Sequence, residues 1–290
     1  MKKIFSLFLL LITAVSFVSC TDSDDTLGDP KLIIKFKFDP TQVRLNNLGQ
    51  PSTLAPGHGG QSPIFNGISS NYIEMAPLNT TPLGLGEILF HGAETTTGGD
   101  LAIDFSQAKI VGEDEVFLEV PLRAVNPGTY RWMRVSLSYQ NYQISVREAG
   151  TDYTGTLASF VGYNTYINSF NIGSHVFDVN ANKLQGYWAF ALNDFDYATS
   201  GQAPVGATTV PNPLWNSSPI PDGSCVVTGN FFEPLVIEEN EKKDIVVTLS
   251  LSTNKSFEWV DTNGNGKYEP SLGENVVDMG LRGLVPTYSR

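Results

Sequence analysis

Hydrophobic and polar residues alternate with a period of two along several stretches of this chain. Between Lys31 and Phe38, apolar side chains occupy every second position and lysine occupies most of the others. The same alternation recurs in residues 116–122, 129–138 and 245–251. Because successive side chains of a strand point to opposite faces of a sheet, each stretch predicts a strand with one face against a core. The side chains expected on these core faces are Leu32, Ile34, Phe36, Phe38, Val116, Leu118, Val120, Leu122, Met133, Val135, Leu137, Ile245, Val247, Leu249 and Leu251.

Two further patterns refine this prediction. In residues 129–138 the face opposite the core is expected to carry Tyr130, Trp132 and Arg134. The stretch from Gly186 to Leu192 is continuously apolar and aromatic, which predicts a central strand buried on both faces.

Long segments rich in Gly, Pro, Ser, Thr and Asn separate the predicted strands. They cover residues 46–71, 76–100 and 196–224, and we expect them to be long loops that carry any ligand surface. No stretch after residue 30 has the spacing of a long amphipathic helix. Together these patterns predict an all-β fold, an antiparallel β-sandwich of immunoglobulin-like or jelly-roll-like type, formed by residues 31–290.

The first twenty residues have the three parts of a secretory signal. Met1 is followed by two lysines, an uncharged apolar run extends from Ile4 to Val18, and the small Ser19 precedes Cys20. The apolar run is shorter than the roughly 20 residues that a membrane-spanning helix needs. Residues 1–19 are therefore predicted to be a signal peptide.

The cysteine at the predicted cleavage point indicates a lipid anchor. The stretch Phe17-Val18-Ser19-Cys20 resembles a bacterial lipobox, which implies that Cys20 is acylated and becomes the mature N-terminus. Phe17 stands where leucine is usual, and relaxed lipoboxes of this kind are typical of Bacteroidetes lipoproteins. The alternative is an ordinary signal peptide that is cut nearby, with Cys20 incidental.

An acidic tether is expected after the anchor. Residues 20–30 are polar and poor in apolar groups, so we expect them to be disordered. Their acidic cluster also resembles the export signal of Bacteroidetes lipoproteins on the outer face of the outer membrane. This resemblance implies a lipid-anchored protein of the outer membrane that faces the cell exterior.

Charge and cysteine content narrow the possible partners. Loss of residues 1–19 removes two lysines and changes the net charge from −12 to about −14, which argues against nucleic-acid binding. Besides Cys20 the chain has one other cysteine, Cys225, so lipidation of Cys20 excludes an intrachain disulfide. The sequence around Cys225 predicts a strand with the thiol as a small buried hydrophobe.

The segment from Asp261 to Glu274 is the one motif with clear ligand chemistry. A calcium loop needs side-chain oxygens at its positions 1, 3 and 5, a glycine turn at position 6 and a backbone carbonyl at position 7. The chain has Asp261, Asn263, Asn265, Gly266 and Lys267 at these places, and Glu269 stands at position 9.

One position of this loop departs from the pattern. The twelfth residue is Leu272 rather than glutamate, and Glu274 follows two residues later, where a bulge would let it reach the ion. The segment resembles EF-hand-like calcium loops without flanking helices, which implies a structural Ca²⁺ held with a dissociation constant of about 10⁻⁴–10⁻³ M. The alternative is a plain Asn-Gly turn between two strands.

Catalytic motifs are not evident. His58, His91 and His175 lack metal-ligand spacing, and we expect His58 to be a solvated residue of a glycine-rich loop. A carboxylate pair for glycoside hydrolysis is defined only in space, so the sequence leaves an enzyme possible without positive support.

Aromatic residues are concentrated in the middle of the chain. Tyr139, Tyr142, Tyr163 and Tyr166 stand among Gln and Asn, and exposed tyrosines can stack against sugar rings or peptides. These four are the candidates for a ligand-binding face, and ordinary packing within a sheet is the alternative.

As a whole the chain resembles uncharacterised surface lipoproteins of Bacteroidetes, on the lipobox, the acidic tether and the segment from Trp259 to Glu274. We therefore predict a non-catalytic cell-surface lipoprotein, a calcium-stabilised β-sandwich that binds an extracellular glycan or protein. The alternatives are a surface hydrolase of polysaccharide or peptide and a structural envelope protein.

Overall fold

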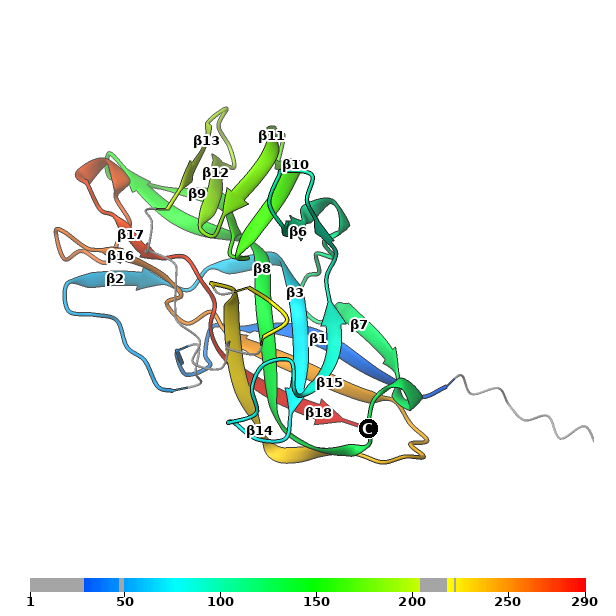
Figure 1. Cartoon of the computed structure of the whole chain (residues 1–290). Helices are drawn as coiled ribbons and strands as arrows, with labels where there is room; N and C mark the ends of the chain where they lie inside the picture. Colours follow the sequence, from blue (N-terminus) through cyan, green and yellow to red (C-terminus); the bar gives the residue numbers. More distant parts are fainter. Residues whose placement is uncertain (1–28, 47–49, 204–217, 222) are drawn as a thin grey trace, which may run out of the picture.

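The computed structural model of the chain describes residues 29–46, 50–203, 218–221 and 223–290 (Figure 1). Within these residues the regular structure is β-strand with a few single-turn 3-10 helices, and there is no α-helix. The prediction of an all-β, sandwich-like protein is confirmed.

A seven-stranded sheet runs through the middle of the molecule (Figure 1). Its order is β13-β12-β9-β8-β3-β4, and β14 pairs with the first part of β8. The strands are β3 (Ile64–Ala76), β4 (Glu87–His91), β8 (Gly128–Glu148), β9 (Thr151–Phe160), β12 (Tyr187–Leu192), β13 (Ala198–Gln202) and β14 (Cys225–Ile237). β8 has 21 residues, and it pairs with β14 up to Leu137 and with β9 from Tyr139 onward. This one strand therefore joins the two halves of the molecule.

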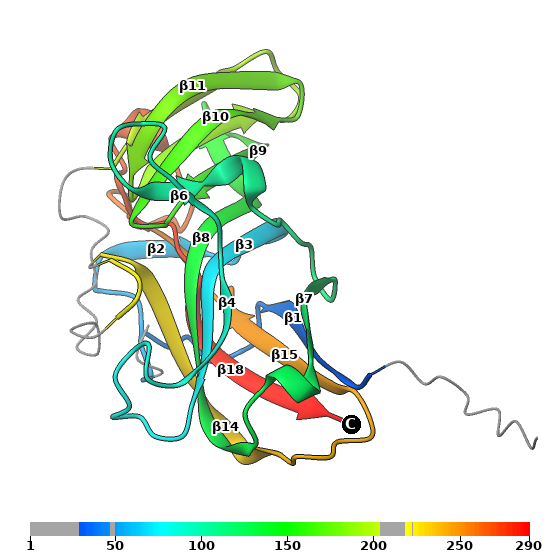
Figure 2. The same cartoon turned by 45° about the vertical axis from the view of Figure 1, so that its right-hand side comes forward.

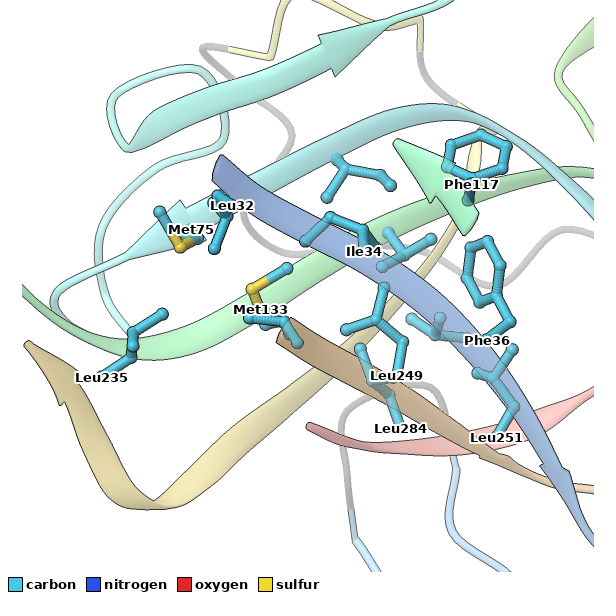
Figure 3. Close-up of a cluster of buried hydrophobic side chains, with 14 of the residues drawn as sticks. Leu32, Ile34, Phe36, Met75, Phe117, Met133, Leu235, Leu249, Leu251 and Leu284 are labelled. Carbon is cyan, nitrogen blue, oxygen red and sulfur yellow. The ribbon is translucent and has the colours of Figure 1, made fainter. Parts of the chain in front are cut away.

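In the first half, a four-stranded sheet packs against β3, β8 and β14 (Figures 2 and 3). Its order is β18-β15-β1-β7, with β1 (Lys31–Asp39), β7 (Val116–Pro121), β15 (Ile245–Ser252) and β18 (Arg282–Ser289). β1 pairs in parallel with β15 and antiparallel with β7. The core between the two sheets includes Leu32, Ile34, Phe36, Ile73, Met75, Met133, Val135, Leu137, Ile245, Val247, Leu249 and Leu251, all at most 1 % exposed. Burial of this apolar surface is the main force that holds the sheets together.

In the second half, the central sheet is the middle of three layers. One face packs against a sheet of order β11-β10-β6-β5, with β5 (Glu94–Thr95), β6 (Ala102–Asp104), β10 (Asn164–Ile172) and β11 (His175–Leu184). The core of this interface contains Tyr139, Phe160 and Phe170. The opposite face packs against β2 (His58–Gln61), β16 (Phe257–Val260) and β17 (Val276–Asp278), around Tyr142 and Trp259.

The predicted core faces of β1 and β15 are confirmed, but β7 differs. Val116, Leu118 and Val120 are only half-buried, whereas Phe117 is 2 % exposed and its ring lies 5.2 Å from that of Phe36. The register of β1 and β7 shifts opposite Phe117. This β-bulge turns the phenylalanine into the core, which a strict period of two does not predict.

Two other strand predictions need correction. Tyr130 lies in the same core cluster as Met133 and not on the opposite face, while Arg134 does lie opposite the core but is fully buried. The strand from Tyr187 to Leu192 alternates between buried and half-buried residues, so it is not buried on both faces.

The predicted long loops contain several strands. Residues 46–71 include β2 and most of β3, residues 76–100 include β4 and β5, and residues 196–224 include β13. β3 was missed because every residue from Gly67 to Ala76 is buried, so polar and apolar residues do not alternate there.

Candidate functional site

The predicted calcium loop connects β16 to β17 at the end of the molecule that lies away from the C-terminus (Figure 1). Asp261 follows β16, and its carboxylate points back into the loop. Asp261 Oδ1 accepts a hydrogen bond from the Gly264 amide at 2.8 Å and Oδ2 accepts one from the Gly266 amide at 2.9 Å. Both glycines have positive φ, 70° and 69°, a conformation that other residues rarely adopt.

The two asparagines continue this inward pattern. Oδ1 of Asn263 accepts from the Asn265 amide at 3.0 Å, and Oδ1 of Asn265 accepts from the Lys267 amide at 2.7 Å. Both side-chain amides donate to Glu269 Oε2, at 2.8 and 2.5 Å. These hydrogen bonds lower the pKa of Glu269 below its ordinary value. The side chains at loop positions 1, 3, 5 and 9, which are Asp261, Asn263, Asn265 and Glu269, therefore point toward one another.

Glu274 reaches the loop although it stands two positions late. A 3-10 turn over Pro270–Leu272 and the left-handed Gly273, φ 80°, shorten the path of the chain. The Glu274 side chain is buried, with Oε1 accepting from the Thr262 amide at 3.1 Å and Oε2 from the Glu269 amide at 2.7 Å.

This donor set fits a hard divalent cation. Three carboxylates and two amides gather on one loop, and oxygen donors of these kinds are the ones that Ca²⁺ prefers. Within the described ranges, no three His, Cys, Asp or Glu side chains form a metal-binding group by themselves. A calcium ion here would therefore also need the Lys267 carbonyl and the oxygens of Asn263 and Asn265. These oxygens now accept backbone hydrogen bonds while the NH2 groups face Glu269, so both amides would have to rotate to bind the ion.

The loop is fastened to the hairpin between β8 and β9. Lys267 Nζ lies 3.3 Å from Asp152 Oδ2, and the Arg147 amide donates to the Tyr268 carbonyl at 2.8 Å. The Tyr268 ring packs 5.6 Å from the buried Trp259 ring. Order in the loop is thus coupled to the second half of the central sheet.

Beside the loop, a buried carboxylate binds two basic side chains. Glu258 Oε1 lies 2.6 Å from His58 Nδ1, and Oε2 pairs with Arg44 Nη2. Burial by itself would raise the pKa of Glu258, but the hydrogen bonds from Arg44 and His58 outweigh it and lower the pKa. The expectation that His58 is a solvated loop residue is therefore wrong, because it begins β2 and holds Glu258 in place.

A second buried ion pair, which no local sequence pattern indicates, joins β3 to β8. Glu74 and Arg134 are both 0 % exposed and their nearest charged atoms lie 3.4 Å apart. Glu74 further accepts from the Tyr72 hydroxyl at 2.5 Å and from the amides of Gly84 and Gly86 at 2.8 and 2.9 Å. The segment between β3 and β4, part of a predicted ligand-bearing loop, is thus fixed to the sheet.

The four candidate tyrosines do not share an exposed face. Tyr139 and Tyr142 lie on opposite faces of β8 and are 5 % and 1 % exposed, and burial raises the pKa of Tyr139 to about 12. Tyr163 and Tyr166 are half-buried, and the Tyr163 hydroxyl donates to Glu94 at 2.7 Å. The expected wet tyrosine face is therefore not present as predicted.

Tyr139 nevertheless borders a cleft where the two halves of the molecule meet. The cleft has a volume of about 290 Å³. Its floor is formed by β3, β8 and β9, and its walls come from the end of β10 and the segment before β7. The lining residues are Asn66, Gly67, Ile110, Tyr139, Asn141, Thr156, Asn171, Ile172 and Gly173.

Amide groups dominate the polar chemistry of this cleft. Asn66 Nδ2 donates to Asn141 Oδ1 at 2.7 Å, which aligns two of the three asparagines. No charged side chain is among the described residues that line it. The cleft therefore offers hydrogen bonds and apolar contact to an uncharged ligand.

The structure describes one of the two cysteines. Cys20 lies outside the described residues, as does most of the predicted acidic tether. Cys225 begins β14, where it is half-buried against the first core. In the part of the chain that is described, no helix is long and apolar enough to cross a membrane.

Comparison with known proteins gives no relative for this chain. No protein-family model, no curated protein and no solved structure matches it.

Proposed function

We propose that this chain is a non-catalytic surface lipoprotein whose β-sandwich binds an extracellular glycan or protein. The signal-like residues 1–19 and the lipobox cysteine Cys20 support an anchor in the outer membrane with the domain facing outward. Two or more acyl chains on such a cysteine hold a protein stably at a bilayer.

The cleft at the junction of the two halves carries the binding part of this proposal. Asn141, Asn171 and Thr156 bring donors and acceptors to one concave site, and Ile110 and Ile172 add apolar surface. Sites with a few convergent polar groups on an apolar lining are typical of ligand binding. Because its described lining lacks an acid–base pair, binding fits this site better than hydrolysis does.

A glycan array combined with pull-downs of surface proteins tests this function. We expect a ligand whose affinity falls about tenfold in Asn141→Ala and in Asn171→Ala, as loss of a buried hydrogen bond of roughly 1–1.5 kcal/mol implies. Asn230→Ala removes an exposed amide on β14 and is the matched control. Absence of any ligand in both screens, or turnover of a polysaccharide or peptide that one Asp or Glu substitution abolishes, would overturn the proposal.

We also propose that Ca²⁺ stabilises the domain through the loop from Asp261 to Glu274. The ligands would be Asp261, Asn263, Asn265, the Lys267 carbonyl, Glu269 and Glu274. The inward hydrogen bonds of these side chains support the proposal, as does the return of Glu274 to the loop.

Thermal melting with Ca²⁺ and with chelator measures this effect. At 10 mM Ca²⁺ and a dissociation constant of about 10⁻⁴ M, linkage predicts roughly 2.7 kcal/mol of added stability. We expect Asp261→Ala to lose that response and Asp100→Ala, at an exposed aspartate elsewhere, to keep it. A melting temperature that does not change across millimolar Ca²⁺ would exclude the metal.

A further inference from the structure

Two aromatic rings lie low across the outer strands of the central sheet. Trp188 of β12 pairs with Gly201 of β13, and a Cβ on Gly201 would lie only 2.7 Å from Trp188 Cζ2. The ring of Phe190 covers Gly155 of β9 in the same way, since a Cβ there would overlap it. Each ring therefore fills the space of an absent side chain, an arrangement in which an aromatic residue compensates for glycine in a strand.

These rings lie on the more exposed face of β12. Tyr187, Ala189 and Ala191 point into the core toward β10 and β11, whereas Trp188 and Phe190 are half-buried on the other side. Phe190 also packs against the core cluster of Tyr142 and Trp259, so Trp188, whose inner side lies against the β13 backbone, is the ring of the two with an outer side available for contact.

Three more aromatic residues extend this surface. Tyr197 and Phe195 are 52 % and 51 % exposed, and the ring of Phe195 lies 5.3 Å from that of Tyr153. The Leu192 amide donates to the Tyr197 carbonyl, so the β12–β13 ladder continues to this point. By the alternation of strands, Tyr197 shares its face with Gly201. We call the surface formed by Tyr153, Trp188, Phe190, Phe195 and Tyr197 the aromatic platform.

Hydrogen-bond acceptors border the aromatic platform. Asp194 and Asp196 are exposed on either side of Phe195, and Asp196 lies 3.9 Å from His175; Asp152, next to Tyr153, is already paired with Arg147 and Lys267 and is not counted among these acceptors. Two low-lying rings flanked by exposed aromatic residues, with acceptors at the rim, suit a ligand that has one broad C–H face and hydroxyl groups around its edge. The carboxylates would repel an anionic ligand, and the chain is itself acidic, with a net charge of −12.

We propose that the aromatic platform is a binding site for neutral saccharide chains. The rings would stack on the apolar faces of successive sugar units, and the aspartates would accept hydrogen bonds from their hydroxyls. This inference rests on the proposed binding function and names its ligand class. The platform and the cleft lie on opposite faces of the central sheet, because Thr156 and Gly155 are consecutive on β9. Variants of the two sites can therefore be examined independently.

The test is isothermal titration of the domain with cellohexaose, laminarihexaose and mannohexaose, and with an oligogalacturonate as the anionic comparison. We expect at least one neutral oligosaccharide to bind more tightly than the oligogalacturonate. Tyr197→Ala and Trp188→Ala should each weaken that binding by about fivefold or more, and Trp188→Phe should retain most of it. Phe232→Ala is the matched control, because Phe232 is 94 % exposed on β14, outside the platform, and its loss should leave binding unchanged.

The outcomes separate the two proposals. Binding that Asn141→Ala weakens but Tyr197→Ala leaves intact would overturn the platform and keep the cleft. Tighter binding of the anionic sugar, or equal losses in Phe232→Ala, would also overturn the platform. Absence of any saccharide binding would overturn the platform as well. The proposed binding function would then depend on protein ligands in the cleft. Tyr197 is exposed, so Tyr197→Ala still tests saccharide binding by the platform even if Trp188→Ala fails to fold.

Discussion

Glu74 and Arg134 show how single residues hold this molecule together. Their ion pair is fully buried, and two further hydrogen bonds from Arg134 Nη2, both 3.3 Å, reach the carbonyls of Leu78 and Asn79. Desolvation lowers the pKa of Arg134, while the Glu74 carboxylate opposes that shift. Each charge is tolerated in the interior because the other is present.

Removal of one partner should therefore be far worse than removal of both. We expect Arg134→Met to lower the free energy of unfolding by about 3–5 kcal/mol, because it leaves the Glu74 carboxylate buried without its counterion. Urea denaturation measures the loss. The double variant with Glu74→Gln, which removes the charge and keeps an oxygen that can accept from the loop amides, should recover part of it, and Arg131→Ala, at an exposed arginine on the same strand, should change stability little. A double variant less stable than Arg134→Met would contradict this account.

At the scale of elements, the small sheet of β2, β16 and β17 depends on one close contact. Gly59 of β2 pairs with Trp259 of β16, and a Cβ on Gly59 would lie 2.5 Å from Trp259 Cε2. The Trp259 ring is 1 % exposed and packs in the core against β8 and β9. The glycine lets the large ring fit between the two layers.

Substitution of this glycine should displace the small sheet. We expect Gly59→Ala to destabilise the protein by about 1–3 kcal/mol through overpacking. Gly112→Ala is the matched control, since its nearest neighbour atom would lie at an ordinary 3.6 Å. Hydrogen exchange should report faster exchange of the amides of β2 and β16 in the first variant only. Unchanged protection in Gly59→Ala would show that the ring can move aside without loss.

The strands differ in how well the sequence predicts them. β1 and the first half of β15 each bury one face, so their alternation identifies the core side chains correctly, although Ser250 and Ser252 of β15 are buried as well. β3 carries Ser69, Ser70 and Asn71 within a buried stretch, and nothing in the order of its residues distinguishes it from a loop. Its burial is a property of the layers above and below it.

For the candidate sites, the contacts can be predicted from sequence only where the interacting residues are near neighbours in the chain. The inward pattern of the loop from Asp261 to Glu274 involves near neighbours, and the motif predicts which side chains gather there. The partners Glu74 and Arg134 are 60 residues apart, so their contact depends on the pairing of β3 with β8. Tyr139 and Tyr142 could have been separated from sequence, because a spacing of three places side chains on opposite faces of a strand.

At the scale of the whole molecule, the long strand β8 belongs to both halves and connects them. The cleft lies on one face of the central sheet, and the loop from Asp261 to Glu274 and the aromatic platform lie toward the other, in the second half. A ligand bound in the cleft would contact β3, β8 and β9, which are already fixed by the packing of the sheets. Preorganised sites of this kind lose little conformational entropy on binding.

The parallel pairing of β1 with β15 also constrains how the chain folds. Leu32 lies opposite Ile245, and the Lys31 amide donates to Asp244, 213 residues later in the sequence. Because β1 and β15 lie far apart in the sequence, their pairing is a long-range contact of the kind that slows folding. Until β15 is in place, the edge of β1 that faces it has unpaired backbone groups, and unpaired strand edges of this kind favour association with other chains. The pairing of β1 with β15, rather than formation of β1 alone, therefore completes the four-stranded sheet that covers the first core.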